Sequence, residues 1–322
     1  MRSPWRSRIA AQAAELVNRT EEPDDRVTQF EALTAAAYHE LARRGVEVAV
    51  VEAGLGGRYD ATNVIPSKVQ ALTSVGLEHT RWLGPTLTDI AEEKLAVVRD
   101  HGTLVIGPLD PESEAVAERV AAERQATLVR APATAGMPLR APGGFQRQNF
   151  ALAPAAADAF LGPGELSAET VASAAAETTI SGRVEIVGER PLTVYDGAHN
   201  PAGARALADS LDDVFGARRP RVAVIGVLED KDAAGMLGEL LPHVDHAVYT
   251  RSQNPRSLSP ATLGSLAAQL NGPPSEAISD PRAAVARARE LAGPAGGVLA
   301  TGSIYLIADL VRADPDRRAS TL

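Results

Sequence analysis

Hydrophobic and polar positions alternate with two different periods along the first half of the chain. Phe30 to Arg44 has the spacing of an amphipathic helix, and Gly45 is a favourable residue just past its end. Val46 to Val51 is apolar except at Glu47, and it is predicted as a parallel strand covered on both faces. Further strands are predicted at residues 69–75, 103–106 and, at an edge, 126–129, and further helices at residues 86–99, 111–124, 149–161 and 167–178. This alternation predicts a parallel sheet with right-handed crossovers.

The alternation breaks near residues 181–183 and then restarts. Strands are predicted at residues 192–195, 222–227, 247–250 and 298–301, and helices are predicted to begin near Pro201, Lys231, Pro260 and Pro281. Proline is well tolerated in the first turn of a helix, so three of these starts are locally consistent. We therefore predict two α/β domains, residues 1–182 and residues 183–322.

Composition narrows the class of protein. A length of 322 residues fits two domains that each bury a core. No apolar run approaches the roughly 20 residues of a membrane span, and the basic start at residues 1–12 lacks the apolar core of a signal peptide. The absence of cysteine excludes disulfides and thiol chemistry and fits a cytoplasmic protein. A net charge of −9 argues against nucleic acid as the main partner, although an anionic substrate can bind at a local basic site.

Glu52 is the first candidate for site chemistry. It is predicted at the carboxyl end of the strand at 46–51, directly before a glycine-rich loop at residues 54–57. Ligands of open α/β sheets bind outside such strand ends, and a carboxylate there can hold magnesium. A tight turn with an incidental acid is the alternative. A dinucleotide fingerprint would need glycine at the position of Tyr59.

His79 closes the next predicted strand, so we expect it at the same sheet edge as Glu52. Its alternative role is that of a structural hydrogen-bonding group. Lys94 lies on the following helix and is one of only three lysines in the chain. It is either a solvated lysine that pairs with Asp89 or Glu93, or part of the site. We predict that the acid, the imidazole and the amine converge around divalent cations.

In the second half, the sequence DGAHNP follows a predicted strand and opens a helix. Asn200, directly before a proline, fits the helix-capping position, which leaves Asp196 and His199 to meet a ligand lodged between the domains. Lys231 lies after the next strand and is equally a charged helix start or a functional residue. Residues 302–303 form either a phosphate-type turn or, as we favour, a tight connection.

Together these segments resemble the folylpolyglutamate synthase/dihydrofolate synthase family, a branch of the Mur ligase superfamily. The matching segments, in order, are TQFEALT, VVEAGLGGRYDATNVI, TSVGLEHTRWLG, IAEEKLAVV, FQRQNFALA, SGRVEIV, YDGAHNP, VLEDKD and TGSIYLI. They span residues 28–307, with an extension of the likeness over residues 8–18. The resemblance implies an amino-terminally truncated, parallel-sheet Mur-ligase-type ATP-binding domain over residues 1–182. A smaller Rossmann-like domain would follow over residues 183–322.

The resemblance implies an ATP-dependent amide ligation in folate biosynthesis. L-glutamate would be joined to the carboxylate of a folate or dihydropteroate through an acyl phosphate, with ATP and Mg²⁺ as cofactors and the chain as a monomer. Carried over position by position, the metal ligands would be Glu52, His79 and a carbamylated Lys94, with His79 and Lys94 also catalytic. The nucleotide would be contacted by Gln146 and Asn149 on its adenine side, and by Arg183, Asp196 and His199 at its phosphate and ribose.

One departure from the family pattern affects the expected activity. Family members begin with a strand and a glycine-rich phosphate loop, but no GxxxxGK[ST] sequence occurs here, and none of the three lysines follows a glycine. We therefore expect a fragment, from a misplaced start codon or a disrupted gene, with little or no ligase activity. We also expect one side of the sheet around residues 46–51 to be exposed. The alternatives are a non-catalytic nucleotide- or folate-binding relic and a Mur-type ligase for a different acid.

Overall fold

The structure is a computed structural model that describes residues 27–133 and 135–312. The chain forms two compact units, Met1–Ala131 and Pro132–Leu322. Both carry parallel strands connected by helices, so the predicted α/β class is confirmed. The predicted domain boundary at residues 182–183 lies inside the second unit and stays a prediction. The features predicted for residues 1–12 and 8–18 lie outside the described residues.

The first unit is built on a parallel sheet. Its helices are α2 (Gln29–Arg43), α3 (Thr80–Leu83), α4 (Leu87–Leu95) and α5 (Pro111–Glu123), with a 3₁₀ turn, η1, at Ala61–Val64. Its strands are β1 (Val69–Leu72), β2 (Thr103–Ile106) and β3 (Thr127–Arg130), which pair in the order β1-β2-β3 within the described residues. β3 is therefore an edge strand, as predicted. The central β2 is buried at Leu104, Val105 and Ile106, and Leu104 and Ile106 pack against apolar residues of α4 and α5.

Side-chain caps fix where these helices begin. Thr28 and Glu31 form a reciprocal capping box at the start of α2, and Thr86 and Asp89 form another at the start of α4. Asp110 caps α5, which carries proline at its first position. α2 ends at Arg43, and Gly45 follows the C-cap with a positive φ of 62°, which suits a residue without a Cβ. The predicted helix boundaries in this unit therefore hold to within a few residues.

The predicted strand at Val46–Val51 is wrong. The segment forms no strand, and its valine side chains are exposed, Val50 completely. An apolar run becomes a strand only where a neighbouring strand pairs with its backbone, and no strand among the described residues pairs with this segment. The prediction was an exposed side of the sheet around these residues, whereas the exposed valines lie in a segment outside the sheet. β1 also ends at Leu72, earlier than predicted.

The second unit contains a larger sheet. Its first elements are α6 (Gly144–Leu161), α7 (Ala168–Glu177), β4 (Glu185–Glu189), β5 (Leu192–Tyr195), α8 (Pro201–Ala208), α9 (Leu211–Phe215) and β6 (Arg221–Ile225). There follow α10 (Ala233–Leu240), the 3₁₀ turn η2 (Leu241–His243), β7 (His246–Tyr249), α11 (Pro260–Gln269), β8 (Ser275–Ala277), α12 (Pro281–Ala292), β9 (Gly297–Thr301) and α13 (Ile304–Val311). The strands pair in the order β4-β5-β9-β6-β7-β8, and within the described residues only β4 is antiparallel to its neighbour.

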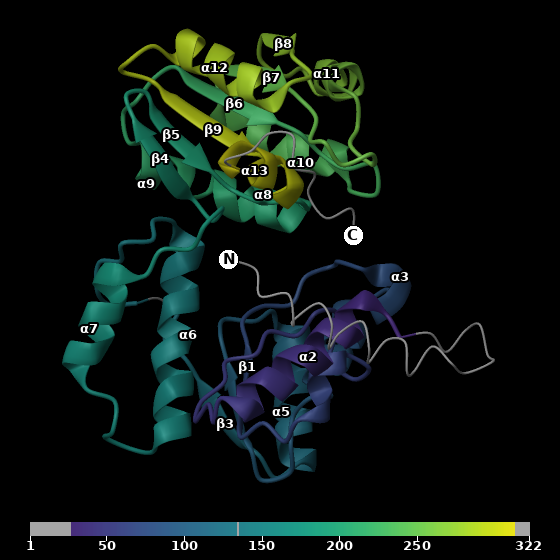
Figure 1. Cartoon of the computed structure of the whole chain (residues 1–322), viewed down its shortest axis with the longest axis vertical. Helices are drawn as coiled ribbons and strands as arrows, with labels where there is room; N and C mark the ends of the chain where they lie inside the picture. The colour runs from purple at the N-terminus through teal and green to yellow at the C-terminus, as the bar shows by residue number, and fades with distance from the viewer. Residues whose placement is uncertain (1–26, 134, 313–322) are drawn as a thin grey trace. The chain divides into compact units, whose positions relative to one another are not determined.

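Helices cover both faces of this sheet (Figure 1). On β6, Ala223 and Ile225 point into one apolar layer with α8, α9, α10 and α11, and Val222 and Val224 into the other with α12 and α13. Successive strand residues face opposite sides, so a strand covered on both faces reads as a continuous apolar run. That pattern is why β5, β6, β7 and β9 were all predicted. The short β4 and β8, with mixed polarity, were missed, as were α9 and α13.

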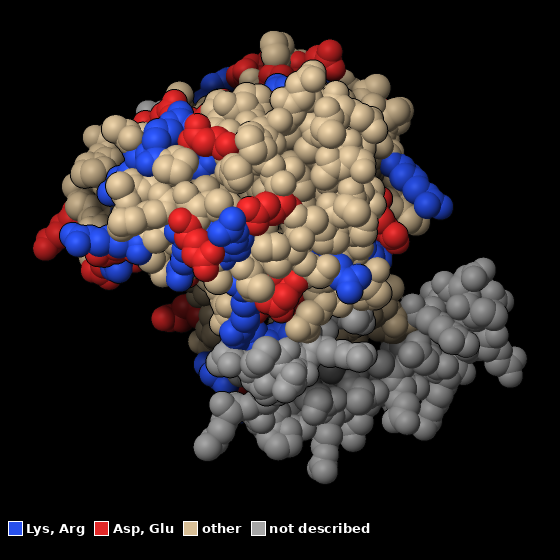
Figure 2. All heavy atoms as spheres, turned by 90° about the horizontal axis from the view of Figure 1, so that it is seen from above, with Lys and Arg blue, Asp and Glu red and all other residues tan. Residues whose placement is uncertain are grey.

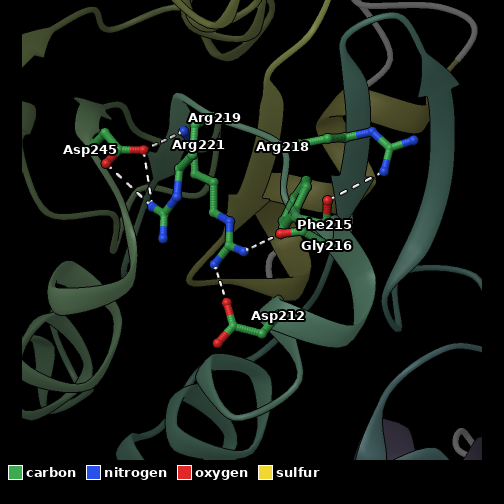
Figure 3. A network of polar contacts seen from close by, with 7 residues as sticks. All are labelled: Asp212, Phe215, Gly216, Arg218, Arg219, Arg221 and Asp245. Atoms are coloured by element: carbon green, nitrogen blue, oxygen red, sulfur yellow. Dashed lines mark hydrogen bonds and ion pairs between the residues drawn. The ribbon is translucent and has the colours of Figure 1, made fainter.

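A polar network fixes the amino end of β6 (Figure 3). Arg221 is buried, and its guanidinium donates to an Asp212 carboxylate oxygen at 2.7 Å and to the Gly216 carbonyl at 2.8 Å while lying over the Phe215 ring. The Arg221 backbone N–H donates to the Asp245 carboxylate, which also pairs with Arg219. These contacts join α9, β6 and the turn before β7, at the sheet edge opposite the carboxyl ends of the parallel strands.

Tyr249 at the end of β7 carries an unfavourable hydroxyl. The side chain is fully buried, its hydroxyl has no hydrogen-bond partner among the described residues, and burial raises the pKa of Tyr249 to about 12. We expect Tyr249→Phe to raise the free energy of unfolding by about 1 kcal/mol, because it removes a buried unpaired donor without opening a cavity. Urea denaturation of the two proteins measures this difference. A loss of stability in the variant would show that the hydroxyl is paired.

Candidate functional site

Asp60 organises the glycine-rich loop of the first unit. One carboxylate oxygen accepts from the backbone N–H groups of Gly54 and Leu55 at 2.9 and 2.8 Å, and the other accepts from the Thr62 N–H and hydroxyl. Burial by itself would raise the pKa of the Asp60 carboxyl, but these hydrogen bonds outweigh burial and lower the pKa below its usual value. The loop that follows Glu52 is therefore held around an ionised carboxylate.

The same loop docks on α3 and α4. The Arg58 N–H donates to both the backbone and the side chain of Glu93 at 3.2 and 3.0 Å. A Cβ on Gly57 would stand 2.7 Å from the carbonyl oxygens of Glu93 and Lys94, and one on Gly56 would stand 2.8 Å from the Leu83 side chain. Only glycine allows approach this close. The segments that carry Glu52, His79 and Lys94 are thus packed together in one unit.

The three predicted metal ligands occupy different settings. Glu52 lies exposed in a segment without regular secondary structure rather than at a strand end, and Lys94 is half-buried in the last turn of α4. His79 lies seven residues beyond the end of β1, in a left-handed conformation at the start of α3, with its Nε2 3.5 Å from a Glu78 carboxylate oxygen. No group of three or more His, Asp or Glu side chains in the described part of the chain has the arrangement of a metal site. The convergence of these three residues stays a prediction.

In the second unit, three strand-end loops meet at the carboxyl edge of the sheet. β5 leads into α8 on one face and the adjacent β9 leads into α13 on the other, so the loops between them form the switch point at which such sheets bind ligands. Gly302 has a φ of 107°, and a Cβ there would stand 2.7 Å from the Gly226 carbonyl oxygen. Residues 302–303 are therefore a tight connection, as favoured from the sequence, that draws the loops after β9 and β6 together.

Asp196 holds the loop after β5. Its carboxylate oxygens accept from the backbone N–H groups of Ala198 at 2.8 Å and Val184 at 2.9 Å. Burial raises the pKa of the Asp196 carboxyl above its usual value, and the two hydrogen bonds offset this only in part. Val184 is itself fully buried with a φ of 48°, which a β-branched residue rarely adopts. Strain of this kind persists where surrounding contacts enforce it, often at functional sites.

Arg183 and His199 both lie against the backbone of the same loop. A Cβ on Gly197 would stand 2.6 Å from an Arg183 guanidinium nitrogen, so that guanidinium lies against the Gly197 backbone. The Gly197 N–H donates to the Gly182 carbonyl at 2.8 Å, and its carbonyl lies 3.0 Å from His199 Nδ1. The structure therefore brings Arg183, Asp196 and His199 together. Asn200 caps α8 by accepting from the Gly203 N–H at 2.7 Å, as the sequence predicted.

Gln146 and Asn149 lie one turn apart on α6. Gln146 is buried, and its side-chain nitrogen has no hydrogen-bond partner among the described residues, whereas Asn149 is exposed. α6 is fixed by the Gly144 N–H, which donates to the Ser210 hydroxyl, and by the Arg147–Asp213 ion pair. A buried amide donor without a partner is a suitable group for a ligand acceptor such as a purine nitrogen.

Two organising residues were not identified from the sequence. Asp60 lies within a matching segment and received no predicted role, although aspartate side chains commonly accept a hydrogen bond from the backbone two residues further on. Gly197 was named only within the sequence DGAHNP, yet its backbone contacts both Arg183 and His199. Both roles depend on contacts between segments, which local pattern does not report.

Charge is mixed over the face of the molecule drawn in Figure 2, where basic and acidic side chains are interspersed. Among the described helices, none combines the length and apolar character required to cross a bilayer.

Comparison with known proteins defines the class. The family model for the Mur ligase, glutamate ligase domain matches residues 182–304. A dihydrofolate synthase/folylpolyglutamate synthase of Escherichia coli (strain K12) is 31% identical over 315 residues, covering 92% of this chain and 72% of that protein. One of Mycobacterium tuberculosis is 36% identical over 280 residues, covering 77% of this chain and 57% of the relative.

Solved structures agree. The folylpolyglutamate synthase of Mycobacterium tuberculosis complexed with ADP and AMPPCP superposes with a TM-score of 0.85 at 30% identity, over 98% of this chain and 79% of that one. The enzyme of Yersinia pestis complexed with AMPPNP and Mn gives 0.80 at 31% identity, over 95% of this chain and 74% of that one. The chain thus has the two-domain Mur ligase fold. It belongs to the folylpolyglutamate synthase/dihydrofolate synthase family, and it spans a little over half of the Mycobacterium tuberculosis relative, at 57%.

Proposed function

We infer that this chain carries the nucleotide- and glutamate-handling part of an ATP-dependent acid–amino acid ligase. The reaction joins L-glutamate to the carboxylate of a folate or dihydropteroate through an acyl phosphate, releasing ADP and phosphate. The observation that carries this proposal is the gathering of Arg183, Asp196 and His199 around Gly197, at the carboxyl edge of the second sheet. Family membership and the nucleotide complexes of the relatives support it.

The residues present fit ATP and magnesium by their chemistry. Gln146 offers an unpaired buried amide for the adenine, and Arg183 offers a guanidinium for phosphate, which it binds in a planar fork. Asp196 keeps the Gly197 loop in place and can accept from a ribose hydroxyl through its remaining lone pairs. Asn149 is available at the exposed side of α6.

Glu52 and His79 supply the oxygen and nitrogen donors for a divalent cation, and a carbamylated Lys94 supplies two more oxygens. When bound, magnesium neutralises the charge that develops on the transferring phosphoryl group. The Asp60-anchored loop keeps the segment after Glu52 against α4, next to Lys94. Cytoplasmic location, which the absence of cysteine favours, and a monomeric state complete the proposal.

We expect nucleotide binding without efficient turnover. None of the three lysines follows a glycine, so the chain has no loop of the GxxxxGK[ST] type for the β- and γ-phosphates. Loss of a single preorganised charge-stabilising donor already slows an enzyme roughly 10²–10³-fold. We therefore expect ADP formation, with MgATP, dihydropteroate and L-glutamate, at least about 10²-fold below that of a full-length relative.

Binding and turnover are measured separately. Isothermal titration with MgADP should show saturable binding that Arg183→Ala weakens about tenfold and that the distant Arg190→Ala leaves unchanged. Absence of nucleotide binding would contradict the ligase assignment and favour a folate-binding relic. Turnover close to that of a full-length relative would contradict the expected loss of activity while supporting the ligase itself.

A further inference from the structure

Asn271 is the only asparagine in the chain that precedes a glycine. In such a pair, the backbone nitrogen of the glycine can attack the side-chain carbonyl of the asparagine, because no Cβ hinders its approach. The cyclic succinimide that forms releases ammonia, and water then opens the ring to aspartate or isoaspartate. Asn200 and Asn254, by contrast, precede proline, which has no N–H. The sequence therefore singles out Asn271 for deamidation.

Asn271 lies in the turn that ends α11, where it is exposed to solvent. Its φ of 54° is left-handed, a conformation that asparagine adopts more readily than most residues at a helix end. The Asn271 N–H donates to the Ala268 carbonyl at 3.2 Å, but no hydrogen bond within the described residues holds its side chain. The side-chain amide is therefore accessible to water and free to turn toward the backbone of the next residue.

Close packing requires glycine at the next position. A Cβ on Gly272 would stand 2.9 Å from the Leu241 side chain and 3.1 Å from the Ala267 carbonyl oxygen. Leu241 is buried and the carbonyl belongs to the backbone of α11, so neither group can give way at low cost. The fold therefore keeps the reactive pair of residues in place, because a bulkier residue after Asn271 would disturb the contact between α11 and η2.

A hydrogen bond protects the pair in the folded chain. The Gly272 N–H donates to the Ala267 carbonyl at 2.9 Å, a bond that closes the end of α11. The glycine nitrogen must lose this proton before it can attack the Asn271 side chain, so the bond has to open first. Helix ends open by local unfolding more often than the whole chain unfolds. Folding therefore slows the reaction without abolishing it.

We propose that Asn271 is a deamidation site of the native protein, and that opening of the carboxyl end of α11 sets the rate of the reaction. The reaction replaces a neutral amide with a carboxylate, and isoaspartate also adds a methylene group to the backbone. The new charge lies at the end of a helix whose last carbonyls already carry partial negative charge, so the product destabilises this turn. The inference concerns the second unit alone and does not depend on the ligase reaction.

The turn at Asn271 leads directly into an edge strand. The Pro274 carbonyl accepts from the Ala247 N–H at 3.0 Å, next to the first pair of residues between β7 and β8. α11 itself packs on both of these strands (Figure 1). Because β8 is short and is paired on one side only, we expect deamidation to loosen β8 and the end of α11 together.

Peptide mapping by mass spectrometry, during incubation of the full chain at mildly alkaline pH, tests the proposal. We expect Asn271 to be the first asparagine converted in the folded chain. In a sample unfolded by urea, its conversion should be at least about tenfold faster, because the Gly272 N–H is then released from Ala267. Earlier conversion of another asparagine, equal rates in the two samples, or an Asn271 that reacts only after unfolding would overturn the proposal.

Hydrogen exchange of the Gly272 amide, observed by NMR, measures the opening of the same bond. Low concentrations of urea that speed this exchange, while the chain stays folded, should speed deamidation of Asn271 in proportion. Deamidation at a constant rate while exchange accelerates would show that opening of the turn does not set the rate.

Two variants at position 271 separate the chemistry from the fold. Asn271→Gly suits the left-handed turn and has no side-chain amide, so it should unfold at the temperature of the parent chain and give no product at this position. Asn271→Asp carries the charge of the aspartate product, and its midpoint of thermal unfolding should be lower than that of the parent by about 1–3 °C. An unchanged midpoint in Asn271→Asp would contradict the proposed loosening of the turn.

Discussion

Asp196→Ala is expected to lower the free energy of unfolding of the second unit by about 2–5 kcal/mol. The substitution leaves the N–H groups of Val184 and Ala198 without their acceptors in a buried setting, and each unpaired buried donor costs about 1–3 kcal/mol. It also releases Val184 from the contact that holds its left-handed conformation. Urea denaturation, monitored by far-ultraviolet circular dichroism, measures this loss of unfolding free energy.

Asp196→Asn is the matched control. Its side-chain oxygen can still accept one of the two N–H groups, while its NH₂ group cannot accept the other, so the loss should be about half as large. The affinity for MgADP is a second measurement. It depends on Arg183, because a loosened loop no longer holds the Arg183 guanidinium beside Gly197. MgADP affinity should therefore fall in both variants. Stability within about 0.5 kcal/mol of the parent in Asp196→Ala would refute the role given to this carboxylate.

The pH dependence of this contribution has a defined sign. Burial raises the pKa of Asp196, so the folded chain keeps the proton to a higher pH than the unfolded chain. The contribution of Asp196 is then most favourable below the unfolded pKa of about 3.9 and is lost as the pH rises through the folded pKa. The stability difference between the parent and Asp196→Asn should shrink over that window as the pH increases.

The hydrophobic pattern of the sequence predicted most strands and helices of the second unit, because the fold of that unit requires this pattern. β5, β6, β7 and β9 are covered on both faces, so their apolar runs are required by the fold. The prolines at 201, 260 and 281 stand at the first helical positions, as predicted. β4 and β8 lie at the edges of the sheet, where a strand needs to be covered only in part. Their sequences therefore lack a continuous apolar run, and they were missed.

Val46–Val51 shows where the same inference fails. The run is as apolar as β6, yet it is exposed, because a strand is defined by its hydrogen-bonded neighbour and not by its own sequence. The candidate site was affected in the same way. Glu52 and His79 were placed at neighbouring strand ends, but one follows no strand and the other lies beyond a loop and begins α3. These segments are joined by contacts of the glycine-rich loop, and those contacts arise from tertiary packing.

Asp60→Ala tests that packing, and we expect it to lower the free energy of unfolding of the first unit by about 2–4 kcal/mol. The ionised carboxylate accepts four hydrogen bonds, and bonds to charged groups are each worth about 1.5–3 kcal/mol where water is excluded. Water has partial access to Gly54 and Leu55, so the total loss of free energy is smaller than the sum of the four hydrogen-bond contributions. Hydrogen exchange of those two amides, observed by NMR, should accelerate at least tenfold.

Thr62→Val is the control, because it removes only the hydroxyl bond to Asp60 and leaves the two loop N–H groups held. Its loss should be about 1 kcal/mol, with the Gly54 and Leu55 amides still protected. The pKa of Asp60 is lowered, so its contribution is full above the unfolded pKa of about 3.9 and is lost as the pH falls through the folded pKa. Acid should thus weaken the Asp60 loop while it strengthens the contribution of Asp196. Unchanged exchange in Asp60→Ala at neutral pH would mean that α4, through Glu93, holds the loop by itself.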